Sequence, residues 1–354
     1  MIRARGFSLV ELMVAITLAL VVTAGVISVF IGSRSAFNST SGTAALTDGG
    51  RFAINFISAS VRGAGYMACT TSRNLQGTLN SAGLKYGFAQ PLGGFEAVNT
   101  GGAGAYNIAA APVGDNTNGH WVGGLDPVLN GLPVQGNDVL VVRSTQINAV
   151  PAYVSNFNSA SQFTVIAPAG SFVSPQLAVV SDCSKGVVFQ ITGAGLGVNP
   201  TISHNGGGGS PGNATSAFPL TFATGALVTP VDTVVYYIGV GADGDGALFA
   251  YSSNATGNFT ANELVPDIEA MQVLYGLDTS LTQTVSEYVT ADQVADFNNV
   301  MSVKVALLAA SPPGAGRVPN PAPYNLLGTV VTAPLDSRSR QVFEETIAVR
   351  NSLH

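Results

Sequence analysis

Charged side chains are scarce in this chain: Asp, Glu, Lys and Arg make up 10% of its 354 residues, and there are only three histidines, at positions 120, 204 and 354. The formal net charge is −6, and no basic stripe is present that could neutralise phosphates, so nucleic acid is not expected as a partner. The sequence also lacks a Gly-x-Ser-x-Gly elbow and a glycine loop followed by Lys-Ser or Lys-Thr. We therefore expect neither an enzyme nor a cofactor.

The amino terminus, by contrast, carries an uninterrupted apolar run from Phe7 to Ile31 with one charge, Glu11, behind a leader that contains Arg3 and Arg5. A membrane-spanning helix needs about 20 apolar residues. The run holds fifteen Leu, Ile, Val and Phe side chains. At about −0.3 to −0.6 kcal/mol each, they outweigh one acid at about +2.5 to +3.5 kcal/mol. The run predicts a membrane anchor, and the two leader arginines favour a cytoplasmic leader with the rest of the chain outside.

Three kinds of segment share this composition. A cleaved secretory signal has a shorter apolar stretch, of about 7–15 residues, and an acid within it is unfavourable. An ordinary transmembrane anchor fits the length but leaves Glu11 without a role, although a carboxylate inside such a helix is costly and usually functional. In the third kind the acid has a defined task, and the residues around Glu11 favour it.

The run Gly6-Phe7-Ser8-Leu9-Val10-Glu11 resembles the prepilin signal of type IV pilins and type II secretion pseudopilins. In these proteins a basic leader ends in Gly, Phe or Met follows, and Glu is the fifth mature residue, as Glu11 is here. The resemblance implies that prepilin peptidase cleaves between Gly6 and Phe7 and methylates the new amino group of Phe7. It also implies that Glu11 neutralises the Phe7 amine of a neighbouring subunit and sets the axial register, because either charge is costly when buried alone. The alternative is that Glu11 snorkels to the lipid headgroups.

The helix is expected to continue beyond the membrane, because residues 32–62 contain no proline and place apolar residues at helical spacing. We divide the region into a leader (1–6), a membrane-spanning half (7–31) and an amphipathic half (32–62) against which a globular domain packs. The spaced apolar residues are Phe30, Phe37, Leu46, Phe52, Phe56 and Val61. The sequence Asp48-Gly49-Gly50 predicts a kink or local melting, since each glycine costs about 1 kcal/mol in a helix interior.

Residues 63–354 are interpreted as one β-rich domain with long loops, and the fold class as α+β. The 42 glycines and frequent Ser, Thr and Asn are typical of secreted β proteins. Runs of β-branched residues bounded by turn residues predict strands at 139–143, 163–167, 187–192, 264–275, 302–308 and 340–350, a hairpin of 233–240 with 247–251, and a short helix at 291–296. Residues 200–219, which include a run of glycines, predict a flexible surface excursion.

Several segments are similar to the PilW family of minor pilins. They include Arg62-Gly63-Ala64-Gly65-Tyr66, Val234-Val235-Tyr236-Tyr237-Ile238, the stretches 268–276 and 299–308, and Ile347-Ala348-Val349-Arg350-Asn351. Residues 75–135 and 195–225 match nothing recognised. The resemblance implies a pilin-like fold, in which a long amino-terminal helix packs against an antiparallel β-sheet domain in the periplasm.

Cys69 and Cys183 are the only cysteines, and both lie in the part of the chain expected in the oxidising periplasm. We expect them to form a disulfide that ties the end of the helix to the β domain, with two free buried thiols as the alternative. No histidine has ligand-like spacing to either cysteine. Asp243 and Asp245 are weak candidate Ca²⁺ ligands. We favour a hairpin turn there, because Asp-Gly supplies the positive φ that such turns need.

The resemblance implies a minor pilin of the type IV pilus, a structural subunit that helps to initiate assembly and lies at the pilus tip. Expected partners are prepilin peptidase, other minor pilins, the major pilin, the inner-membrane assembly platform and membrane lipid. The expected location is the bacterial inner membrane, with a single span and a periplasmic domain, and the extracellular pilus after assembly. The alternatives are a minor pseudopilin of type II secretion and a tip adhesin that binds a host or surface ligand through Gly/Asn-rich loops.

Overall fold

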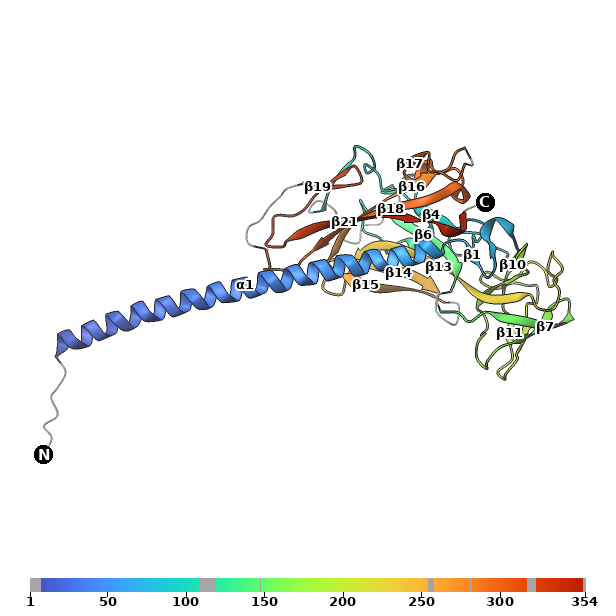
Figure 1. Ribbon diagram of the computed structural model, residues 1–354, viewed down its shortest axis with the longest axis horizontal. Coiled ribbons are helices and arrows are strands. Elements are labelled where there is room, and N and C mark those ends of the chain that lie inside the picture. The colour runs from blue at the N-terminus through green and yellow to red at the C-terminus, as the bar shows by residue number, and fades with distance from the viewer. Residues whose placement is uncertain are drawn as a thin grey trace, which may run out of the picture.

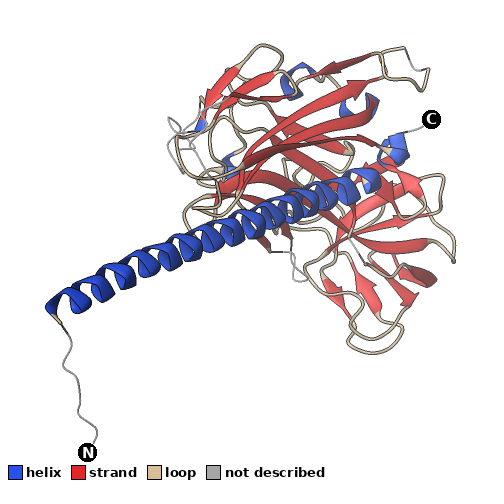
Figure 2. Cartoon of the chain, turned by 60° about the vertical axis from the view of Figure 1, so that its left-hand side comes forward, coloured by secondary structure: helices blue, strands red, loops and turns tan. Residues whose placement is uncertain are grey.

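A single long helix, α1 (Leu9–Gly63), projects from a body made almost entirely of β-strands (Figures 1 and 2). The computed structural model describes residues 8–108, 119–146, 148–253, 258–280, 282–316 and 323–352. The amino-terminal half of α1 stands clear of the body, and the second half lies across it. The predicted fold class, a long helix packed against β-sheets, is confirmed.

The largest sheet is built around β13 (Leu227–Val240), which pairs with four other strands. Its first residues pair with β7 (Ala152–Ser159) and β9 (Leu177–Ser181), and its remainder pairs with β6 (Val139–Thr145) and β14 (Gly246–Ser253). The other members are β3 (Leu75–Gly77), β4 (Leu92–Phe95), β8 (Gln162–Ile166), β10 (Gly186–Gln190), β11 (Gly193–Ala194), β12 (Thr201–Ser203) and β15 (Phe259–Pro266). All pairings are antiparallel except β3 with β10. The sheet therefore joins two halves of the body through one strand.

The second main sheet is antiparallel and has the strand order β17 (Glu287–Val289), β16 (Ile268–Leu277), β18 (Val300–Ala310), β21 (Arg340–Ala348). Two small sheets complete the body. One pairs β1 (Tyr66–Met67) with β2 (Thr70–Thr71), and the other joins β5 (Ala105–Asn107), β19 (Pro323–Leu326) and β20 (Thr329–Thr332). Short 3₁₀ turns occur at η1 (Ser72–Asn74), η3 (Pro127–Leu129), η4 (Ala291–Gln293), η5 (Phe297–Asn299) and η6 (Arg350–Ser352).

The helix packs on the body through one narrow face. Ala53, Ile57 and Val61 are fully buried there, in one apolar cluster with residues of β16 and β18. At the end of this face Arg62 pairs with Glu345 of β21 at 2.9 Å, and Tyr236 of β13 donates a hydrogen bond to Ser60 at 2.8 Å. The buried stripe supplies most of the attachment, since an exposed ion pair adds about 0–1 kcal/mol.

The predicted kink at Asp48-Gly49-Gly50 is wrong, because α1 is continuous from Leu9 to Gly63. Gly50 lies directly against the ring of Phe343 on β21, and a Cβ at Gly50 would overlap that ring. Gly42 lies against Ala315 in the same way. The glycines let the helix approach the sheet closely, and this packing offsets their cost of about 1 kcal/mol each.

The aromatic residues of the second half of α1 do not face the body. Phe37, Phe52 and Phe56 are 71%, 60% and 44% exposed, whereas Leu46 and Val61 are buried. The predicted amphipathic helix is thus present, but its aromatic side chains lie away from the docked domain. Spacing alone cannot tell which of two apolar stripes faces the core.

The strand predictions hold except for 264–275, which contains two strands. Asp267 stands between β15 and β16 with φ of +59° and ends one strand before the next begins. The predicted hairpin is β13 with β14, and the predicted short helix at 291–296 is the 3₁₀ turn η4.

Residues 152–228 form a separate lobe at the end of the body opposite the amino terminus, here called the distal lobe (Figure 1). It has its own core, in which Phe163, Phe189 and Phe218 surround His204. Residues 200–219 are not a free excursion. Asn213 exchanges two hydrogen bonds of 2.7 Å with the backbone of Gln190, which fastens this segment to β10.

Candidate functional site

The amino-terminal turn of α1 contains the predicted register residue. Ser8 caps the helix, and its Oγ accepts a hydrogen bond from the backbone N–H of Glu11 at 3.2 Å. The Glu11 side chain is exposed in the first turn, where a carboxylate is stabilised by the helix dipole. Gly6, Phe7 and the leader arginines lie outside the described residues.

The first half of α1 presents apolar side chains on all sides. Leu9, Val21 and Ile31 are 75%, 70% and 61% exposed, and none of the most apolar stretch is buried against the body. By length and composition, this helix can cross a membrane. Isolated in water it would expose far more contiguous apolar surface than soluble monomers do, so it requires lipid or other helices around it.

Phe37, Phe52 and Phe56 extend the uncovered surface along the second half of α1, and we call these three residues the aromatic stripe. At 100° per residue they fall within one face of the helix, on the side opposite Gly50 and Ile57. The sequence shows the aromatic residues but not their outward position. The stripe provides a second apolar contact surface outside the membrane-length segment.

Cys69 and Cys183 form a disulfide, as predicted. Cys69 follows β1, a few residues after α1 ends, and Cys183 lies in the turn between β9 and β10. The bond therefore connects the end of the helix to the distal lobe.

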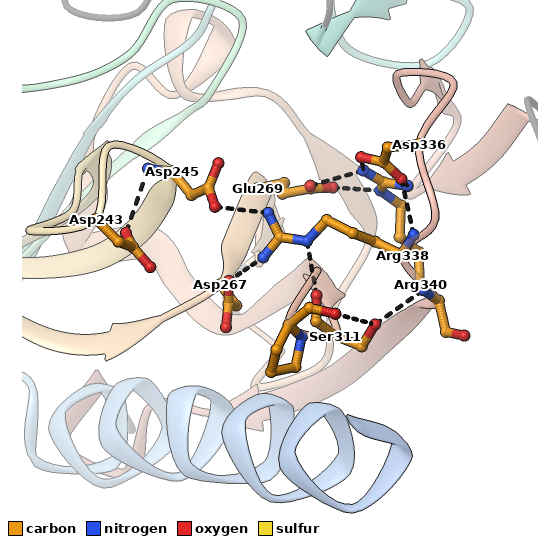
Figure 3. A network of polar contacts seen from close by, with 10 residues as sticks. Asp243, Asp245, Asp267, Glu269, Ser311, Asp336, Arg338 and Arg340 are labelled. Atoms are coloured by element: carbon orange, nitrogen blue, oxygen red, sulfur yellow. Dashed lines mark hydrogen bonds and ion pairs between the residues drawn. The ribbon is translucent and has the colours of Figure 1, made fainter. Parts of the chain in front are cut away.

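The candidate calcium ligands lie in the turn between β13 and β14. Oxygens of Asp243, Asp245 and Asp267 lie within 4.8 Å of one another. The guanidinium of Arg338 lies among them, however, and donates to Asp245 at 2.8 Å and to Asp267 (Figure 3). Gly244 has φ of +89°, as a hairpin turn requires. The arginine already pairs with two of the three carboxylates, so the geometry favours the hairpin interpretation and we do not propose a calcium site.

A second arginine, Arg340, completes this network and is itself buried. It donates to both carboxylate oxygens of Glu269, at 2.6 and 2.9 Å, and also to Asp336 (Figure 3). Two oppositely charged residues buried together are stable only as a hydrogen-bonded pair. The network thus fastens β21 to β16 and has a structural role. The sequence analysis missed it, although Asp336-Ser337-Arg338-Ser339-Arg340 is a dense group of charges in a charge-poor chain.

A pair of buried carboxyl groups, Glu96 and Asp138, lies where β4, β6 and β16 meet. Glu96 is 4% exposed and Asp138 2%. Asp138 accepts backbone hydrogen bonds from Ala97 at 3.0 Å and from Val273 at 2.8 Å, and Glu96 accepts one from the Thr100 hydroxyl at 3.0 Å. Burial and mutual repulsion raise the pKa of Asp138, and burial raises the pKa of Glu96 from 4.5 to about 7. The folded domain therefore holds a proton here that the unfolded chain releases.

Glu96→Gln is expected to change how stability depends on pH. The proton on Glu96 stabilises the fold fully below pH 4.5, and this contribution is lost as the pH rises to about 7. One such proton gives a slope of about 1.4 kcal/mol per pH unit. In urea titrations followed through Trp121, the free energy of unfolding of the wild type should fall across this window relative to Glu96→Gln.

The matched control is Glu287→Gln, a change at an exposed carboxylate of β17. It should leave the wild-type profile unchanged, and a parallel profile for Glu96→Gln would contradict the assignment. His204 acts in the opposite direction, because burial lowers its pKa from 6.5 to about 4. The neutral His204 side chain contributes to the free energy of unfolding above pH 6.5, and this contribution is lost as the pH falls toward 4. His204 is present in the wild type and in both variants, so the difference between wild type and Glu96→Gln at each pH excludes its contribution.

Comparison with known proteins agrees with this architecture. Residues 235–351 match the family described as type IV pilus-assembly protein W, PilW, and residues 1–27 match the prokaryotic N-terminal methylation motif. No curated protein sequence matches the chain. Among solved structures, a type IV-like pilin from Thermus thermophilus is similar at 18% identity, covering 51% of this chain and 87% of that chain, with a TM-score of 0.24. A score this low supports no argument from that structure.

The long apolar helix and the match to the methylation motif are features of type IV pilus-related, pilin-like proteins. Within that class, the matching family is PilW, and the resemblance predicted from the sequence is confirmed. The description of the matched family is that of a pilus-assembly protein. The apolar helix and the prepilin motif fit a membrane-anchored pilin.

Proposed function

We propose that this chain is a minor pilin that takes part in initiating type IV pilus assembly and is placed at the pilus tip. The observation that carries the proposal is the uncovered apolar half of α1, which follows directly from a prepilin-type terminus. Such a helix needs a membrane before assembly and neighbouring helices afterwards, and a pilus supplies both. The role is structural and requires no catalytic group.

In this proposal residues 1–6 are the leader, 7–31 the span in the inner membrane, 32–62 the docked half of the helix and 63–354 the periplasmic domain. Glu11 pairs with the methylated amine of Phe7 in a neighbouring subunit. The aromatic stripe packs against the helices of other minor pilins or the major pilin. Prepilin peptidase and the inner-membrane assembly platform act on the chain before it leaves the membrane for the pilus.

A type II secretion pseudopilin would share the same helix and the same processing. The match of residues 235–351 to a type IV pilus-assembly family favours the pilus. Deletion of the gene should therefore reduce surface pili and leave type II secretion of enzymes unchanged, and the reverse result would assign the chain to secretion.

The first test is the intact mass of the membrane-extracted protein, measured with and without prepilin peptidase. With the peptidase we expect a chain that begins at N-methylated Phe7, because the enzyme cuts after Gly6. Without it the chain should begin at Met1. A chain that begins at Met1 in both strains, or one cut beyond Ala24, would show an ordinary anchor or a secretory signal and overturn the proposal.

A further inference from the structure

The distal lobe is almost free of charge. Residues 152–228 contain only two charged side chains, Asp182 and Lys185, and these pair with each other at 3.6 Å. The one histidine in the lobe, His204, is buried and stacked on Phe218. A partner that is recognised through charge, such as an acidic polymer or a basic protein segment, finds no complementary group here.

The outer surface of the three strands β7, β8 and β12 presents both polar and apolar side chains. We call it the platform and define it by Tyr153, Asn158, Gln162, Thr164, Ile166 and Thr201. The alternate residues of the same strands, such as Phe163, Val165 and Ile202, point into the core of the lobe and are fully buried. The platform is therefore rigidly backed by an aromatic and aliphatic core.

Hydrogen bonds between neighbouring strands fix the polar groups of the platform. Asn158 donates to the Thr164 hydroxyl at 3.0 Å, and the hydroxyls of Thr164 and Thr201 are 3.1 Å apart. Beside them Tyr153 and Ile166 form a cross-strand pair, and their side chains are 54% and 58% exposed. The result is an exposed aromatic ring next to a row of fixed groups that can both donate and accept hydrogen bonds.

We propose that the platform binds an uncharged polysaccharide. Sugar hydroxyls both donate and accept hydrogen bonds, as do the amides and hydroxyls of the platform, and the apolar face of a sugar ring can lie on Tyr153 and Ile166. Of the six platform residues only Tyr153 and Ile166 carry large apolar side chains, which is too few for the apolar centre of a stable protein interface. The platform is also at the end of the molecule farthest from the amino terminus (Figure 1). The proposal is independent of the assembly role, and it places recognition on a sheet face rather than on the Gly/Asn-rich loops.

The test uses the full-length chain in detergent with six probes. These are four neutral matrices (amorphous cellulose, chitin, dextran and agarose) and two acidic ones (alginate and heparin). We expect retention on at least one neutral matrix, unchanged in about 0.5 M NaCl because no ion pair contributes. Tyr153→Ala should weaken it about tenfold, the effect of losing one central aromatic contact. Thr164→Asp, which places a charge in the middle of the row, should weaken it at least as much.

The matched control is Tyr66→Ala, which removes another exposed tyrosine, 42% exposed, near the end of α1. It should leave retention unchanged. Unfolding curves for all variants establish that the lobe is folded. No retention on any of the four neutral matrices, retention that salt abolishes, preference for alginate or heparin, or an equal loss in Tyr66→Ala would each overturn the proposal.

Discussion

Glu11→Ala is expected to be cleaved and methylated normally and yet to be lost from sheared pili. The carboxylate lies in the exposed first turn of α1, away from the globular body as far as the structure describes it. In an assembled pilus, the methylated amine of Phe7 would then be a buried charge without a partner. Such a charge costs several kcal/mol, which corresponds to more than about a hundredfold in the equilibrium for incorporation. Immunoblots of the pilus fraction and the membrane fraction measure the distribution.

Ser8→Ala is the matched control for this experiment. It removes the side chain that caps the same turn and leaves the carboxylate in place, at a cost of about 1 kcal/mol in helix stability. Ser8→Ala should therefore enter pili at close to the wild-type level. If Glu11→Ala is processed and also enters pili as the wild type does, Glu11 has no part in assembly, and the snorkelling interpretation is correct.

Loss of the Cys69–Cys183 disulfide is expected to give the largest loss of stability of any single change described for this chain. The bond closes a loop with a sequence separation of 114 residues. On the chain-entropy model a loop of this size contributes about 4–5 kcal/mol. The domain of the Cys69→Ser/Cys183→Ser double variant should unfold at correspondingly lower urea concentration, as measured by the fluorescence of Trp121, the only tryptophan and one that is fully buried.

Reductant supplies the internal check. Dithiothreitol should lower the stability of the wild-type domain to that of the double variant and should have no effect on the variant itself. A difference below about 1 kcal/mol between the oxidised wild type and the double variant would mean that packing alone holds the helix end to the distal lobe.

The amino-terminal helix and most strands could be predicted from the sequence, because their signals are local. An apolar run that follows a basic leader and β-branched runs bounded by turn residues both depend on neighbouring residues only. The disulfide was predictable because only two cysteines exist. The same local reasoning fails at Gly50, since the residue that explains this glycine, Phe343, is almost the whole chain away.

Other features depended equally on distant partners. The run of glycines at 206–209 suggests a flexible segment, but Asn213 fastens that region to Gln190. The break at Asp267 is stabilised by Arg338, and the raised pKa of Glu96 results from its enclosure by β6 and β16. None of these pairings leaves a trace in residue spacing, because each joins segments that meet only after the chain has folded.

The disulfide has a mechanical consequence. Without it, tension on the distal lobe would travel back to α1 through strand pairings, those of β13 and that of β3 with β10. The covalent bond offers a shorter path, from the turn between β9 and β10 through Cys183 to Cys69, and then over a few residues to the end of the helix. A load applied at the far end of the molecule is thus carried to α1 by covalent bonds, and residues 70–151, which link Cys69 to the distal lobe along the chain, are bypassed. The strand pairings of the body therefore do not have to bear this tension for the distal lobe to stay attached to α1.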